Sequence, residues 1–187
     1  MKAAFLSSVA VIAAVVGGPA QADEAALRAL EQGGHAILIR HAKVGSHERA
    51  LVLDPAGNCA NELNLNDEGR AQARRLKALL DRAGVRFDLV LTSPFCRARD
   101  TATLVFGRAT VDENLTALEL GTPEQAQART RAMTETLARQ AGKGNVALVT
   151  HRPNVMMLTL EIVEEGEAIV ARIRADGELD VVGRLRP

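Results

Sequence analysis

Short apolar runs alternate along the chain with longer segments whose apolar residues recur at helical spacing. Three runs are especially clear: AILI at 36–39, FDLVLT at 87–92 and NVALVT at 145–150. Each is short, rich in leucine or β-branched residues and followed by polar residues at its C-terminal end, which is typical of a buried strand in a parallel sheet. We therefore expect three neighbouring parallel strands.

The segments between these runs are predicted to be helices. Residues 23–32 form a short amphipathic segment that Gly33-Gly34 should end, and Asn66 or Asp67 is expected to cap a helix that continues to about residue 82. The buried stripe of that second helix should consist of its apolar residues Ala71, Leu76, Leu79 and Leu80.

The second half of the chain continues the alternation. Ser93-Pro94 predicts a helix start, because serine caps helices and proline is preorganised for the first helical position. That helix should run to about residue 106, with others at 123–141 and from Pro153, and a β-hairpin is expected at 167–185 with its turn at Asp176-Gly177. With no repeat or linker, the pattern predicts one three-layer α/β/α domain that has a mainly parallel central sheet and a C-terminal β-hairpin.

Residues 1–22 have the pattern of a signal peptide. Lys2 precedes a short apolar core, and Ala20-Gln21-Ala22 is the small-residue pattern of a signal-peptidase site. A retained membrane anchor is the alternative, but the apolar stretch is short for a hydrocarbon core about 30 Å thick. We expect cleavage after Ala22, a domain at 23–187, and a periplasmic or secreted protein without membrane contact after cleavage.

Composition argues against several classes of partner. The chain has 23 basic and 23 acidic residues, so it has no general attraction for nucleic acid or for an anionic membrane. It has four Phe and neither Trp nor Tyr, so aromatic faces for stacking bases or sugars are scarce. Functional positive charge must therefore be local, and a small-molecule partner is favoured. The oligomeric state is left open.

The two cysteines, Cys59 and Cys96, favour a disulfide if the protein is exported, because pairing is the default in an oxidising compartment. Such a bridge would tie the long loop expected at 42–65 to the start of the helix that carries Arg97. Two separate thiols, one of them buried, are the alternative. A catalytic role for Cys96 is disfavoured, because cysteine-dependent phosphatases place an arginine six positions after the nucleophile and this chain has Ala102 there.

The predicted strands bring four functional side chains to one edge of the sheet. Arg40 and His41 follow the first run, Arg97 the second and His151 the third. Ligands of open α/β sheets bind in the crevice outside the carboxyl ends of the strands. These side chains should therefore converge on a site for a dianion, and phosphate is the best candidate.

The residue types at this crevice fit phosphoryl transfer. A neutral imidazole beside an arginine can attack phosphorus, while arginines bind the phosphoryl oxygens and stabilise the charge that grows on them. A second histidine, once protonated, can share that task. A zinc site made of His41, His151 and Asp54 is the alternative, but the two arginines oppose a cation. We expect no metal and no other cofactor.

Four motifs resemble the histidine phosphatase superfamily, which has the phosphoglycerate mutase-like fold. Arg40-His41-Ala42 is similar to its Arg-His-Gly element, LNDEGRAQARRL to its L-x-x-x-G-x-x-Q-A helix, LTSPFCRARDTA to its S-x-x-x-R-A-x-x-T-A helix, and VTHRPNV to its second histidine. The resemblance spans about residues 35 to 160 and extends to an exported subgroup with two such cysteines. It implies that His41 is the phosphorylated nucleophile and that Arg40, Arg97 and His151 complete a metal-free phosphate pocket.

Two positions depart from the family pattern, and the general acid needs its own argument. Ala42 stands where the family usually has Gly, and Arg152 follows the second histidine, where it either adds a cation to the pocket or, as we expect, faces solvent at a helix start. The family usually takes a carboxylate from the loop after the arginine helix. Here that loop offers Glu113 and Glu119, and we choose Glu119. His47, in the long loop, is expected to be an exposed polar residue.

The sequence therefore predicts an exported phosphomonoesterase that acts through a phosphohistidine on a small phosphorylated substrate. A mutase or phosphotransferase of the same fold is the first alternative, and the lack of a long insertion that could cap the substrate argues against it. A catalytically weak, phosphate-binding periplasmic module is the second. The sequence does not identify the substrate.

Overall fold

The computed structural model describes residues 19–45, 53–54 and 57–187. Most of the expected signal peptide lies outside the described residues, and so does His47. Within the described part of the chain, no helix combines the length and the apolar character needed to cross a membrane.

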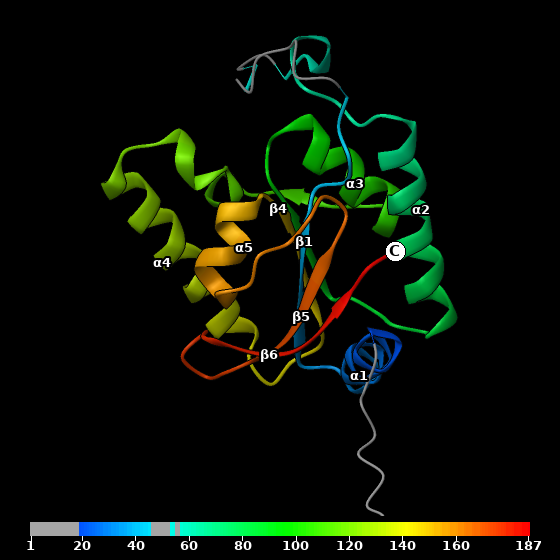
Figure 1. Cartoon of the computed structure of the whole chain (residues 1–187). Coiled ribbons are helices and arrows are strands. Elements are labelled where there is room, and N and C mark those ends of the chain that lie inside the picture. The colour runs from blue at the N-terminus through cyan, green and yellow to red at the C-terminus, as the bar shows by residue number, and fades with distance from the viewer. Residues whose placement is uncertain (1–18, 46–52, 55–56) are drawn as a thin grey trace, which may run out of the picture.

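A six-stranded mixed sheet forms the centre of the domain (Figure 1). The strand order is β3-β2-β4-β1-β5-β6. The four strands β3, β2, β4 and β1 run parallel, whereas β5 pairs antiparallel with β1 and β6 antiparallel with β5. The strands are β1 (His35–Arg40), β2 (Leu89–Thr92), β3 (Thr110–Val111), β4 (Val146–Thr150), β5 (Ala168–Ile173) and β6 (Leu179–Leu185). The three predicted parallel strands and the C-terminal hairpin are thus confirmed.

Helices cover both faces of this sheet, which confirms the three-layer prediction (Figure 1). One layer contains α1 (Pro19–Gln32), α2 (Asp67–Arg82) and α3 (Cys96–Phe106), and the other contains α4 (Pro123–Gln140) and α5 (Arg152–Thr159). Alternate residues of one strand serve the two cores: Ile37 and Ile39 pack toward the first layer, whereas Ala36 and Leu38 pack toward the second. This is the side-chain alternation expected of a strand buried on both faces.

The structure corrects two local predictions. Helix α3 begins at Cys96, not at Ser93-Pro94, and its cap residue Phe95 makes no side-chain capping bond. The Ser93 hydroxyl lies before the helix, where it contacts His151 at 2.8 Å and accepts from the Phe95 N–H at 3.4 Å.

The buried stripe of α2 also differs from the prediction. It consists of Gly69, Ala73, Leu76 and Leu80, while Ala71 and Leu79 are only half-buried. Small residues take the first half of this stripe because the chain after β1 crosses the helix there. A Cβ added at Gly69 would lie 2.0 Å from the carbonyl oxygen of Lys43.

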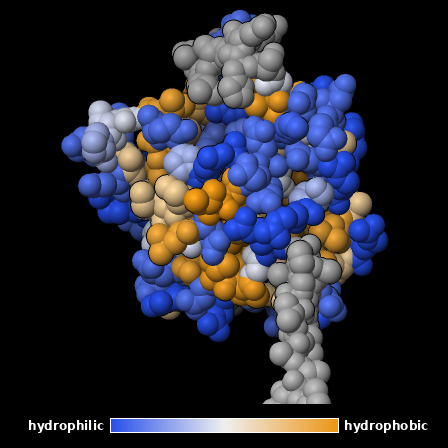
Figure 2. All heavy atoms as spheres, in the orientation of Figure 1, coloured by the Kyte–Doolittle hydropathy of each residue, from blue (hydrophilic) through white to orange (hydrophobic). Residues whose placement is uncertain are grey.

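The surface is largely hydrophilic on the face shown in Figure 2, with apolar side chains gathered over α5. The exposed apolar residues at the end of α5 and just after it include Met156, Met157, Leu160 and Ile162.

Candidate active site

The register of the parallel strands places the two predicted histidines next to each other. Arg40 at the end of β1 pairs with Thr150 at the end of β4, and the His41 backbone N–H donates to the Thr150 carbonyl at 2.9 Å. His41 and His151 therefore leave the sheet side by side, with ring centroids 5.4 Å apart.

His41 is held as a neutral imidazole. The ring is buried, and its Nδ1–H donates to the Ala42 carbonyl at 3.0 Å, so the hydrogen sits on Nδ1 and the lone pair on Nε2. Burial lowers the pKa of His41 to about 3, and the nearby Arg97 and Arg40 charges act in the same direction. His41 thus offers an unprotonated Nε2 at any pH near neutrality.

His151 is fixed by two partners, one from the β2–α3 connection and one from the first turn of α3. Its Nε2 lies 2.8 Å from the Ser93 hydroxyl, and its Nδ1 lies 3.5 Å from Nη2 of Arg97. Because an arginine can only donate, Nδ1 is the acceptor and the Nε2–H donates to Ser93. Burial, followed by the neighbouring His41 and Arg97, lowers the pKa of His151 well below its usual value.

Arg97 is the most deeply buried cation of the site. It is the second residue of α3, its side chain is 4% exposed, and its guanidinium carbon lies 4.2 Å from the centre of the Phe95 ring. Its Nη1 is buried without a hydrogen-bond partner among the described residues. Unpaired buried donors are costly, so this one is a natural ligand for an anionic oxygen.

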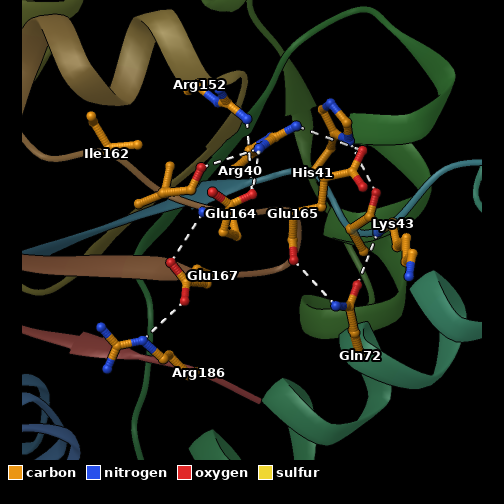
Figure 3. A network of polar contacts seen from close by, with 12 residues as sticks. Arg40, His41, Lys43, Gln72, Arg152, Ile162, Glu164, Glu165, Glu167 and Arg186 are labelled. Carbon is orange, nitrogen blue, oxygen red and sulfur yellow. Dashed lines mark hydrogen bonds and ion pairs between the residues drawn. The ribbon is translucent and has the colours of Figure 1, made fainter. Parts of the chain in front are cut away.

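Arg40 lies between His41 and an acidic segment, 164–167 (Figure 3). Its Nη1 donates to the Val163 carbonyl at 3.1 Å, and its guanidinium lies 3.6 Å from Glu164 and 3.7 Å from Glu165. Its Nε is buried without a hydrogen-bond partner among the described residues. Arg152 points toward the same place and lies 3.8 Å from Glu164.

Two motif residues hold the backbone around His41. Gln72 of α2 accepts from the Lys43 N–H at 2.9 Å and donates to the Glu165 carbonyl at 3.2 Å, so it joins the segments on either side of the site (Figure 3). Thr101 of α3 accepts from the Ala42 N–H at 2.9 Å and donates to the Arg97 carbonyl at 2.7 Å. The Ala42 N–H is therefore already engaged at the position where the family usually has Gly.

A third motif residue, Asn154 of α5, supports the loop that carries the candidate acid. Its side-chain amide donates to the Thr116 carbonyl at 3.0 Å, and its oxygen accepts from the Leu118 N–H at 3.3 Å. Glu119 follows directly, and it is exposed.

All five predicted site residues line one pocket of about 280 Å³. The lining comprises Arg40, His41, Arg97, His151 and Glu119, together with Val44, Leu63, Arg152, Pro153 and Glu165. Arg152 contributes to the pocket wall, which the solvent-facing expectation did not foresee, although half of its side chain is exposed. Glu113 is exposed and does not line it.

The sequence analysis missed Glu165, a second pocket carboxylate. It lies in the loop after α5, outside the motifs. The pairing of β5 with β1, together with the Gly166 N–H that donates to the Arg40 and His41 carbonyls, brings this loop to the crevice. A larger hollow of about 410 Å³ near Leu80, Phe87 and Phe106 contains no histidine and none of the site residues.

The predicted disulfide is present between Cys59 and Cys96. It joins the loop before α2 to the first residue of α3, immediately before Arg97. Among the described residues, no group of three or more His, Cys, Asp or Glu side chains is arranged to hold a metal ion.

Comparison with known proteins agrees with this geometry. Residues 36–124 match the family model described as histidine phosphatase superfamily (branch 1). A comparison with curated proteins found no match.

Solved structures with this fold cover most of the chain. The protein histidine phosphatase SixA complexed with tungstate is 20% identical, with a TM-score of 0.57, over 82% of this chain and 97% of that one. A candidate alpha-ribazole-5'-P phosphatase from Escherichia coli K-12 is 20% identical, with a TM-score of 0.60, over 81% and 96%. A phosphoglycerate mutase from Thermus thermophilus is 23% identical, with a TM-score of 0.51, over 82% and 99%. The match identifies residues 36–124, which carry the motifs at His41 and Arg97, as belonging to the histidine phosphatase superfamily, and the solved structures share the fold of the chain.

Proposed function

We propose that the protein is a phosphomonoester hydrolase that acts on a small phosphorylated substrate through a phosphohistidine at His41. The observation that carries this proposal is the state of the His41 ring. Its Nδ1–H donates to the Ala42 carbonyl, so its Nε2 has a free lone pair. This ring lines a pocket that Arg40, Arg97 and His151 also line. Transfer of a phosphoryl group needs a neutral nucleophile and cationic side chains that bind the phosphoryl oxygens.

The reaction has two steps. In the first, Nε2 of His41 attacks phosphorus, the bond to the substrate oxygen breaks, and a carboxylic acid gives its proton to the leaving alcohol. In the second, the resulting carboxylate takes a proton from water, the water oxygen attacks phosphorus, and the P–N bond breaks to release inorganic phosphate and regenerate His41. Arg40 and Arg97 bind the phosphoryl oxygens in both steps, and His151 joins them when its Nε2–H turns from the Ser93 hydroxyl to a phosphoryl oxygen. No metal or other cofactor is needed.

We assign the proton transfer to Glu119, in preference to Glu165. Both carboxylates line the pocket, but the Glu165 carboxylate lies 3.7 Å from the Arg40 guanidinium, which engages it in an ion pair. Glu119 has no ion pair within 4.0 Å among the described residues.

Leaving-group dependence separates the two carboxylates. An aryl phosphate with a good leaving group barely needs an acid, whereas an alkyl phosphate does. Glu119→Gln should therefore slow alkyl phosphate hydrolysis by about 10²-fold or more and aryl phosphate hydrolysis much less. The same selective loss in Glu165→Gln, with Glu119→Gln active on both substrates, would reverse the assignment.

A catalytically weak phosphate-binding module is the second candidate, because the Ala42 N–H is occupied by Thr101 and is not available to a phosphoryl oxygen. Turnover of an aryl phosphate by the purified protein decides between these two. Including an alcohol acceptor in the same assay tests the mutase or phosphotransferase alternative: a hydrolase releases inorganic phosphate in the same amount as the aryl alcohol, whereas a transferase makes a new phosphate ester.

We further propose that the protein is exported and that residues 1–22 are removed. The Cys59–Cys96 bridge supports this, because disulfides persist in oxidising compartments. Intact mass of protein recovered from the cell envelope or medium should show an N-terminus at Asp23 and no alkylatable thiol before reduction. An N-terminus at Met1, or two thiols that alkylate without reduction, would contradict the proposal.

A further inference from the structure

Glu62 is a buried carboxylate that the proposed reaction does not use. Its side chain is 0% exposed, and it lies directly after the short 3-10 turn Cys59–Asn61. Among the described residues it has no ion pair within 4.0 Å. Burying a carboxylate is costly unless its oxygens are satisfied, so its partners indicate why it is there.

The main partner of Glu62 is the first backbone N–H of α3. Glu62 Oε2 accepts from the Cys96 N–H at 2.7 Å, and Oε1 lies 3.5 Å from the Asp54 N–H. The helix has no capping side chain of its own, because its cap residue is Phe95. Glu62 therefore caps α3 from a position 34 residues away in the sequence, and its carboxylate lies at the positive end of the helix dipole.

The residue after Cys96 is Arg97, so this cap stabilises the chain segment that orients the most deeply buried cation of the pocket. Burial lowers the pKa of the Arg97 guanidinium, and the carboxylate of Glu62 is the first of the charges that oppose this, followed by Glu119. Glu62 thus also supplies a buried countercharge to Arg97.

A covalent link reinforces the same contact. The Cys59–Cys96 bridge joins the two ends of this arrangement, and the Asn64 side chain donates to the Cys59 and Glu62 carbonyls. The next residue, Leu63, lines the pocket. The loop is therefore attached to the first turn of α3 by one disulfide and by one charged hydrogen bond.

We propose that Glu62 is a positioning residue for Arg97: its carboxylate fixes the first turn of α3 and neutralises the buried guanidinium, so that Arg97 is oriented for a phosphoryl oxygen before the substrate arrives. This inference rests on the proposed function only in assuming that the pocket binds phosphate. It predicts that Glu62 affects phosphate binding and catalysis through Arg97 and not through general stability.

The test is a double-mutant cycle on the full protein with the disulfide intact, verified by mass. Inorganic phosphate binding is measured by calorimetry, and kcat and KM are measured with an aryl phosphate, at a temperature where every variant is folded. Glu62→Ala should weaken phosphate binding about tenfold and lower kcat at least as much, because the Arg97 guanidinium would no longer be held in the orientation that binds a phosphoryl oxygen. Glu62→Gln keeps an acceptor for the Cys96 N–H but loses the charge, so its effect should be smaller.

The Arg97→Ala background distinguishes positioning from loss of stability. If Glu62 acts through Arg97, adding Glu62→Ala to Arg97→Ala should change phosphate affinity by less than about twofold. Glu178→Gln is the matched control, because it removes the same charge from an exposed site on the C-terminal hairpin and should behave as wild type.

Two results would overturn the inference while leaving the proposed function intact: unchanged phosphate affinity and kcat in both Glu62 variants, or an equal loss of affinity with and without Arg97. Should Glu62→Ala not fold, the same cycle is run with Glu62→Gln. A wild-type protein that binds no phosphate would overturn the proposed function and this inference together.

Discussion

The pocket has two walls of opposite character. The inner wall consists of His41, Arg97 and His151, each at most 7% exposed and each held by a ring contact or hydrogen bond. The outer rim consists of Arg152 and Glu164, whose charged groups lie 3.8 Å apart and whose side chains are 50% and 71% exposed. Arg40 lies between the wall and the rim, with a side chain that is 14% exposed.

This difference separates side chains that must be held in place for catalysis from side chains that can move to accommodate a substrate. Charges of the inner wall act in a low-dielectric environment and cost no rearrangement when a phosphoryl group arrives. The ion pair of the rim is solvated and screened by salt, so a ligand can replace it at little cost in free energy. We expect the chemistry to depend on the inner wall, and substrate preference to depend on the rim.

The largest expected effect is on the inner wall at the nucleophile. His41→Ala removes the covalent route altogether, so kcat/KM for an aryl phosphate should fall on the order of 10⁴-fold or more. Phosphate binding should survive, because Arg97 and His151 remain. Activity within tenfold of wild type would show that His41 is not the nucleophile.

The next effect concerns the oxygen ligands of the same wall. Arg97→Ala and His151→Ala should each lower kcat by about 10²- to 10³-fold and raise KM much less, because the charge that they stabilise grows in the transition state. Steady-state kinetics give both constants. A rise in KM at unchanged kcat would mean that the two residues only hold the substrate, and the distinction between wall and rim would then fail.

A moderate effect is expected on stability as the pH falls. The native protein keeps His41 neutral down to a pKa of about 3, whereas the unfolded chain protonates it near 6.5. The unfolded state thus binds more protons between these values, so the free energy of unfolding should decrease as the pH drops from 7.5 to 5.

Urea unfolding followed by far-UV circular dichroism at several pH values measures this slope. His41→Asn is the matched control, because it removes one titrating ring and should flatten the dependence. An unfolding free energy that is independent of pH in the wild type would mean that neither buried histidine is held neutral.

The smallest effect is expected at the rim. Arg152→Ala and Glu164→Gln break a solvated pair, so KM should change by no more than about threefold and the change should shrink as salt is added. Kinetics at two ionic strengths test this. A loss of kcat as large as that of Arg97→Ala would make Arg152 part of the inner wall.

The sequence predicted the inner wall better than the rim, and the reason is physical. His41, Arg97 and His151 each follow a buried strand or begin the helix after it, so strand pattern and motif place them together. Glu165 reaches the pocket through tertiary contacts, among them the antiparallel pairing of β5 with β1 and the Gln72 contact with its carbonyl, which no local pattern specifies.

The start of α3 shows the same limit. Ser93-Pro94 has the local pattern of a helix start, yet the cap comes from Glu62, a tertiary contact, and Ser93 bonds to His151. Gly69 is a further example: helical periodicity favours larger apolar residues on that face, but the chain at Lys43 passes too close for any Cβ. Close approaches between distant segments override local preference at these points.

Trapping the covalent intermediate tests the central claim most directly. The wild-type protein is mixed with an aryl phosphate, quenched within milliseconds under alkaline conditions that preserve phosphohistidine, digested and analysed by mass spectrometry, with His41→Asn treated in parallel. The account predicts an acid-labile phosphoryl group on the peptide that contains His41, formed and lost at rates that match turnover, and none in the variant. Hydrolysis at full rate with no phosphorylated His41 peptide, or with the label on another residue, would contradict it.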